Sequence, residues 1–174
     1  DSYFQYLYHS NMSEIEDYNL FGEQRDLPDV VHCETIEARS LLHDWEFKPH
    51  RHARLHQFLL VEDGGGMARI EERQHRLSAG DLVNLPMGTV HGFSFQPGTK
   101  GWVVTLASEL LEDSLQEGEG LRPLLRNPAL VRFSSEGRQI VAAIFAEFPG
   151  RDFARAHVLR GLSSALAGLV ARAL

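Results

Sequence analysis

The stretch from Gly80 to Pro86 and on to Gly88 places the tightest limit on how this chain folds, because two turn signals enclose a very short apolar run. Gly80 can adopt a positive φ without steric cost, and Pro86 presets the φ angle of the second turn, which ends at Gly88. The four residues between the turns, 82–85, are too few for a helix. They predict a short strand bounded on both sides.

A second strand is predicted immediately after this turn, over residues 91–95. His91, Phe93 and Phe95 alternate there with smaller residues, so one face of the strand carries an imidazole followed by two aromatic rings. We expect this face to form the inside of a small barrel.

His50 and His52 form a matching feature upstream. In an extended segment, alternate residues point to the same side, so both imidazoles can reach one metal ion together. The chain contains nine histidines, and an alternative reading makes these two ordinary surface residues. The orientation of His56 stays open, because strict alternation turns it outward if Gln57 faces inward, whereas a local bulge reverses that assignment.

Composition favours a single acidic domain of 174 residues with a net charge of −7. Lysine and arginine do not cluster, so we expect no nucleic-acid-binding surface in these residues. A single cysteine, Cys33, is typical of a reducing compartment. The sequence shows neither a signal peptide nor the run of roughly 20 apolar residues that spans a membrane. We therefore expect a cytoplasmic protein that does not associate with membranes.

Turn signals divide the chain into an N-terminal arm (1–29), a β-rich part (30–107) and a helical part (108–174). Strands are predicted at residues 31–36, 41–47, 57–62, 67–71, 81–85, 91–95 and 102–106. Leu41, Trp45 and Phe47 are expected to share one face. Short strands at near-regular spacing indicate a jelly-roll barrel, so the fold class is mainly β with C-terminal helices.

Three helices are predicted after Ala107, at about residues 108–115, 135–148 and 152–174. The last two form a helical hairpin, and Ser134 or Ser135 is the expected cap of the first of them. Apolar residues recur at helical spacing along the last helix. The stripe predicts a homodimer contact through Val158, Leu162, Leu166, Leu169 and Ala173. Phe58 and Leu60 on the outside of the barrel are expected to cover part of the helical apolar surface within one chain.

The two half-patterns together resemble the paired motif of the cupins. Gln57 stands where cupins usually carry a glutamate, and Phe95 stands where they usually carry an asparagine. The resemblance implies a metal set of His50, His52, Gln57 and His91, binding Zn, Ni, Fe or Mn. A neutral amide is a weaker ligand than a carboxylate, so we expect a lower affinity for a divalent ion with the geometry kept.

A barrel followed by a helical hairpin resembles the N-terminal effector-sensing domain of AraC-family transcriptional regulators. The likeness extends over about residues 18–174 and is strongest to regulators of 4-hydroxybenzoate and hydroxyphenylacetate catabolism. It is carried by the segments Leu42–Trp45, Pro49–His52, Leu55–Gln57, Leu85–Pro86 and Val90–Phe93. The resemblance implies that the protein is no enzyme, that the barrel binds a small effector and that the helices form a dimer. DNA contact is then expected from a separate C-terminal part with two helix-turn-helix motifs, which these residues do not contain.

A planar aromatic acid is the effector that we expect. Beside Gln57, the candidate ligand-binding residues are Trp45, Phe93, Phe95 and Trp102 for stacking, and His50, His52, His91 and Arg54 for the carboxylate. Each aromatic residue fits ordinary barrel core equally well. Two rival interpretations stay open, a metal-dependent cupin enzyme such as a dioxygenase or isomerase and a dimerising barrel with a collapsed pocket.

Overall fold

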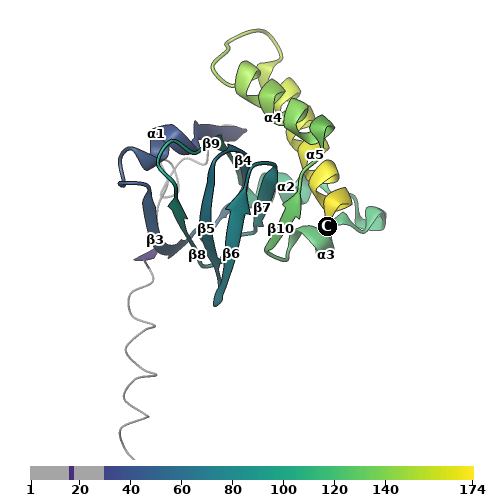
Figure 1. Ribbon diagram of the computed structural model, residues 1–174. Coiled ribbons are helices and arrows are strands. Elements are labelled where there is room, and N and C mark those ends of the chain that lie inside the picture. Colours follow the sequence, from purple (N-terminus) through teal and green to yellow (C-terminus); the bar gives the residue numbers. More distant parts are fainter. Residues whose placement is uncertain (1–15, 18–29) are drawn as a thin grey trace, which may run out of the picture.

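The computed structural model describes residues 16–17 and 30–174. Two five-stranded sheets face each other as a β-sandwich of the jelly-roll type, and C-terminal helices lie on one side of it (Figure 1). The predicted fold class is therefore confirmed. Most of the expected N-terminal arm, 1–29, lies outside the described residues.

The first sheet has the strand order β1-β3-β8-β5-β6. Its strands are β1 (Glu16–Asp17), β3 (Glu46–Arg51), β8 (His91–Phe95), β5 (Gly65–Ile70) and β6 (Arg73–Ser78). All neighbours are antiparallel except β1, which pairs with β3 in parallel, with Glu16 opposite His50. The two described residues of the arm thus lie along the strand that carries the first candidate histidine.

The second sheet has the order β10-β7-β4-β9-β2. Its strands are β10 (Ala129–Arg132), β7 (Asp81–Leu85), β4 (Leu55–Asp63), β9 (Lys100–Ala107) and β2 (Val31–Thr35). All of its pairings are antiparallel. The strand β10 comes from the part of the chain that we expected to be helical, and it adds an edge to the sheet beside β7.

The helices are α1 (Ile36–Ser40), α2 (Ser108–Ser114), the 3-10 turn η1 (Glu117–Glu119), α3 (Leu121–Leu125), α4 (Ser135–Glu147) and α5 (Arg155–Ala173). Ser134 caps α4 as expected, because its hydroxyl accepts a hydrogen bond from the Gly137 amide at 3.1 Å. None of the helices in residues 30–174 combines the length and the apolar character needed to cross a membrane.

Apolar residues form two clusters, one on each face of the second sheet. The inner cluster lies between the sheets and includes Leu59, Phe93 and Val103. The outer cluster joins the other face of the second sheet to α2–α5, and it includes Phe58 and Leu60 as predicted. Because both faces of this sheet are covered, every residue of β7 is buried.

The expected strand over residues 41–47 is wrong in its first half. Residues 36–40 form α1, capped by the Thr35 hydroxyl, and a turn follows before β3 begins at Glu46. Asp44 and Trp45 both have positive φ in this turn, at 52° and 63°. Leu41 consequently does not share a face with Phe47, since its side chain is 69% exposed.

Candidate functional site

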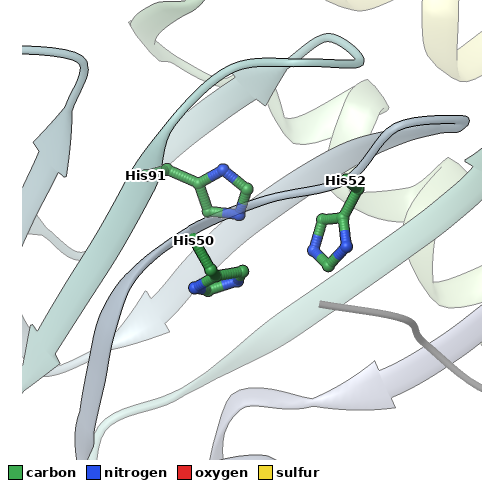
Figure 2. A group of neighbouring side chains, drawn as sticks. All are labelled: His50, His52 and His91. Carbon is green, nitrogen blue, oxygen red and sulfur yellow. The ribbon is translucent and has the colours of Figure 1, made fainter. Parts of the chain in front are cut away.

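Three imidazoles converge inside the sandwich, from His50 on β3, His52 just beyond it and His91 at the start of β8 (Figure 2). Each residue is at most 4% exposed. One ring nitrogen of each lies within 4.8 Å of those of the others. His50 and His91 face each other directly across the two strands, with ring centroids 4.5 Å apart.

Both turns predicted from the sequence are present, and the second of them holds this cluster in place. Gly80 and Gly88 adopt positive φ, at 87° and 78°. The Gly88 amide donates a hydrogen bond to the His52 carbonyl at 2.8 Å, so the second turn fixes the end of the β3 segment. A Cβ atom at Gly92 would lie 2.8 Å from the Phe47 carbonyl oxygen. Glycine therefore lets β3 approach β8 next to the histidines.

Backbone carbonyls fix the tautomers of two rings. The Nδ1 atom of His50 donates to the Lys48 carbonyl at 2.7 Å, and Nδ1 of His91 donates to the Thr89 carbonyl at 2.8 Å. Each bond places the proton on Nδ1 and the lone pair on Nε2. Burial, with a further contribution from the nearby His50, lowers the pKa of His91 to about 3. At neutral pH, His91 is therefore an uncharged ring that can ligate a metal through Nε2.

Gln57 faces the same interior as the histidines. It lines one pocket with His50 and His91, and its amide nitrogen donates to the Thr105 hydroxyl at 3.0 Å. That bond uses the NH₂ group of the side-chain amide as donor and leaves its carbonyl oxygen as the acceptor.

The donor set fits a divalent metal ion. Four-coordinate zinc with bonds of about 2.1 Å requires ligand nitrogens roughly 3.4 Å apart, so small ring rotations suffice to bring the imidazoles into range. Neutral imidazoles held by backbone carbonyls are the usual protein ligands of Zn, Ni and Fe. His50, His52 and His91 would hold such an ion, and the ion would act there as a Lewis acid. The expected fourth ligand, Gln57, lines the same pocket.

The pocket beside the histidines is mostly apolar and small. Its lining consists of Ile36, Arg39, Phe47, His50, Gln57, Leu59, His91, Phe93, Phe95 and Val103. The cavity volume is about 20 Å³, which holds about one water molecule or ion. A ligand containing an aromatic ring therefore requires lining side chains to move.

Two expected ligand-binding residues lie elsewhere. Trp102 is on the outer face of β9, where its ring contacts Phe145 of α4 at a centroid distance of 4.4 Å. Arg54 precedes β4, and its exposed guanidinium donates to Glu109 at 2.7 Å. The expectation that these two side chains face the pocket is wrong. Trp45 packs against the inner cluster but does not line the pocket, whereas Phe93 and Phe95 do.

Arg39 lines the pocket, although the sequence pattern did not predict it there. It comes from α1, in a region where a strand-to-strand connection was expected, and its guanidinium lies over the Phe47 ring at 5.5 Å. Glu34 on β2 forms an ion pair with it. In the sequence, Thr35 is a typical N-cap residue and is followed by residues that favour a helix. The strand-like patterns on both sides of this short segment conceal that signal.

His56 faces outward, as alternation predicts when Gln57 faces inward. Its Nε2 atom donates to Asn84 Oδ1 at 2.7 Å, and Asn84 Nδ2 donates to the Leu125 and Asn127 carbonyls at 3.0 and 2.8 Å. Burial lowers the pKa of His56 to about 4, so the ring is neutral. This buried network connects β4 and β7 to the end of α3.

Comparison with models of protein families shows to which family the chain belongs. Residues 34–157 match the AraC-like ligand binding domain. The chain belongs to this family. None of the curated protein sequences is significantly similar to the AraC-like domain described here.

Solved structures similar to this AraC-like domain include two of ToxT from Vibrio cholerae. One, with bound unsaturated fatty acid, is 9% identical with a TM-score of 0.52, over 86% of the chain and 56% of ToxT. The other, bound to (E)-4-(8-methylnaphthalen-1-yl)but-3-enoic acid, is 8% identical with a TM-score of 0.51, over 83% and 58%. The AraC-like transcriptional activator CuxR is 11% identical with a TM-score of 0.46, over 80% and 49%. The AraC-like domain thus spans between about half and three fifths of these proteins, and the ToxT likeness shows a shared fold.

Proposed function

We propose that this chain is the effector-binding and dimerisation domain of an AraC-type transcriptional regulator and that its effector is a small aromatic carboxylic acid. The observation that carries the proposal is the buried pocket between the sheets, where Phe47, Phe93 and Phe95 adjoin polar groups from His50 and His91. Aromatic rings stack on such a wall, while the imidazoles meet the oxygen atoms of the ligand. The domain itself carries out no reaction in this proposal.

A divalent metal ion is part of the proposed site. His50, His52 and His91 would hold it, and an ion there offers a Lewis acid to a ligand oxygen. The same cluster without an ion presents imidazoles that form hydrogen bonds with a ligand. In either form one polar group of the ligand lies at the histidines.

The proposed signal is a population shift. Because the cavity holds only about 20 Å³, a state that accommodates an aromatic acid differs from the compact state in the position of lining elements such as α1. A ligand that binds the wider state better shifts the population towards it. Two elements can transmit this movement from the pocket to the rest of the domain. The arm pairs with β3 at His50, and β2 runs from α1 into the outer cluster beneath the helices.

The ligands of the similar ToxT structures support the proposed ligand class. Both the unsaturated fatty acid and (E)-4-(8-methylnaphthalen-1-yl)but-3-enoic acid carry a carboxylate and a large apolar part. DNA binding is proposed for a further C-terminal part of the regulator, and a cytoplasmic location follows from that role.

Calorimetric titration with hydroxybenzoates and hydroxyphenylacetates, with and without Zn²⁺, tests the effector proposal. We expect at least one acid of the panel to bind at a ratio of one per chain. The matched measurement uses a Phe93→Ala variant, which removes part of the stacking wall and is expected to weaken binding by about tenfold, since aromatic contacts contribute about 0.5–1.5 kcal/mol beyond burial. If no acid of the panel binds to the wild-type domain under either condition, the proposed ligand class is wrong.

A metal-dependent enzyme is the second candidate, and the convergence of three buried histidines favours it specifically. Metal centres of enzymes keep an open position for substrate, which a set of three imidazoles and a weak amide ligand allows. Turnover of a candidate substrate that is lost on chelation and restored by one metal would favour this function over a sensing role.

The proposed dimer contact uses the surface stripe of α5 in revised form. Leu166 is fully buried within the chain, so its expected place in the contact is wrong. Val158 is 42% exposed, and Leu162, Ala165, Leu169 and Ala173 follow it at helical spacing without being fully buried. These five residues are the stripe that remains for a partner.

Glutamate at both Val158 and Ala165 is expected to convert the dimer to a monomer, because like charges would face each other across the contact. Light scattering should then change from twice 19.6 kDa to 19.6 kDa. Phe153→Glu is the control, since Phe153 is fully exposed in the loop before α5 and lies off the stripe. A wild-type domain that stays monomeric at high concentration would contradict the dimer proposal.

A further inference from the structure

Arg39 is the charged residue that lines the pocket in the described part of the chain. Its side chain is only 15% exposed, its guanidinium lies 5.5 Å from the centre of the Phe47 ring, and Glu34 forms an ion pair with it. A guanidinium with so little access to water requires an anionic partner, because an unpaired buried charge is costly. In the structure described here, the Glu34 carboxylate fills that role.

A continuous series of ring contacts connects Arg39 to the histidine cluster. The Phe47 ring beneath Arg39 packs against the Phe95 ring, with their centroids 6.2 Å apart. Phe95 stacks on Phe93 at a centroid distance of 5.4 Å and an interplanar angle of 10°. The centroid of the Phe93 ring lies 5.9 Å from that of His91. The pocket therefore has a cationic group at one end of an aromatic wall and imidazoles at the other. A planar ring with a carboxylate on one side and a hydroxyl on the other matches this arrangement.

We infer that Arg39 binds the carboxylate of the effector and that Glu34 is the internal carboxylate which the effector displaces. This inference rests on the proposed function and names the residue that selects aromatic acids over neutral aromatic compounds. A guanidinium pairs with a carboxylate through two parallel hydrogen bonds, so one carboxylate replaces another without leaving Arg39 uncompensated. A neutral ligand cannot make this exchange, since it would leave either the cation or its own polar group poorly paired.

The exchange also gives the ligand a direct effect on the fold. Glu34 is on β2 and Arg39 is on α1, so their ion pair ties the helix back to the end of the strand. Ligand binding at Arg39 releases Glu34 and loosens that tie. The same strand carries Val31 and Cys33 in the outer cluster beneath the helices, which places the released segment next to the proposed dimer helices.

Calorimetric titration of 4-hydroxybenzoate and 4-hydroxyphenylacetate, each beside its neutral amide, tests the inference on four variants. Arg39→Gln is expected to weaken binding of the acids by about 30-fold or more, as removal of one partner from a buried charge pair does. Glu34→Gln is expected to tighten it several-fold, because the competing carboxylate is gone. Neither substitution should change the weak binding of the amides, and Arg54→Gln is the control, since Arg54 is exposed and pairs with Glu109.

Wild-type binding separates failure of this inference from failure of the proposed function. If the wild-type domain binds an acid and Arg39→Gln binds it equally well, the inference is wrong and the effector proposal stands. Equal affinity of the wild-type domain for an acid and its amide would also overturn the inference about Arg39. If no acid binds to the wild-type domain, the ligand class fails and the inference fails with it. Arg39→Lys keeps the charge without the paired hydrogen bonds, so an intermediate affinity is expected even if Arg39→Gln does not fold.

Discussion

Replacing His91 by alanine is expected to lower the affinity of the domain for Zn²⁺ or Ni²⁺ by about 100-fold or more. Loss of residues that only orient a ligand costs about 10–100-fold in metal affinity, and His91 is one of the proposed ligands themselves. Its imidazole is neutral, carries its lone pair on Nε2 and lies 4.5 Å from the His50 ring. Direct titration of the metal-free domain measures the affinity.

The same loss of zinc affinity is expected to appear in thermal unfolding as a smaller stabilisation by zinc. At a zinc concentration 100 times the wild-type dissociation constant, binding stabilises the native state by about 2.7 kcal/mol, and a 100-fold weaker variant gains only about 0.4 kcal/mol. For a domain of this size the difference corresponds to roughly 5–9 °C in Tm. His157→Ala is the control, because His157 is an exposed residue of α5. Equal zinc responses of His91→Ala and wild-type protein would contradict the metal site.

Gln57→Glu is the converse change and is expected to raise zinc affinity by at least about tenfold, since a carboxylate is a stronger ligand than an amide. The bond to Thr105 survives the substitution, because the threonine hydroxyl can turn from acceptor to donor. An unchanged affinity would show that residue 57 does not reach the ion.

Asn84→Ala is expected to destabilise the domain by about 2–4 kcal/mol. The side chain is fully buried and joins three partners, His56 and the carbonyls of Leu125 and Asn127. Its removal leaves those buried groups without their hydrogen bonds, at about 1–3 kcal/mol for each that finds no new partner. Urea unfolding should show a lower midpoint at an unchanged slope.

The control for Asn84 is Asn127→Ala. Asn127 is exposed and its side chain donates to the Pro123 carbonyl, so we expect its replacement to change the free energy of unfolding by no more than about 0.5 kcal/mol. Combining Asn84→Ala with His56→Phe should cost less than the sum of the two, because both remove the same hydrogen bond. Equal stability of the Asn84→Ala and Asn127→Ala variants would mean that the network does not hold the helical part to the sheet.

Turn residues made β7 and the histidine-bearing strand β8 predictable from the sequence. Gly80, Pro86 and Gly88 bound β7 on both sides, and the predicted strands 81–85 and 91–95 coincide with β7 and β8. Alternation then placed His91, Phe93 and Phe95 on the inner face, where the structure has them. Local chemistry fixes these features, so no knowledge of distant contacts was needed.

The wrong predictions lie where contacts between residues distant in the sequence determine the structure. Both faces of β9 are covered, one by the other sheet and one by the helices, so its sequence has no polar side to show which face is inward. Trp102 was therefore assigned to the wrong face. Arg39 was missed because α1 contains only five residues, and so short a helix is stabilised by packing rather than by its own sequence.

The ring resonances of the histidines, followed by NMR while Zn²⁺ and then 4-hydroxybenzoate are added, test most directly whether the inner pocket is the ligand site. Single substitutions assign the resonances, and the exposed His157 serves as an internal reference. The account predicts that the signals of His50, His52 and His91 shift together on each addition while that of His157 stays unchanged. Shifts confined to exposed histidines, with the three buried rings unaffected by both compounds, would contradict it.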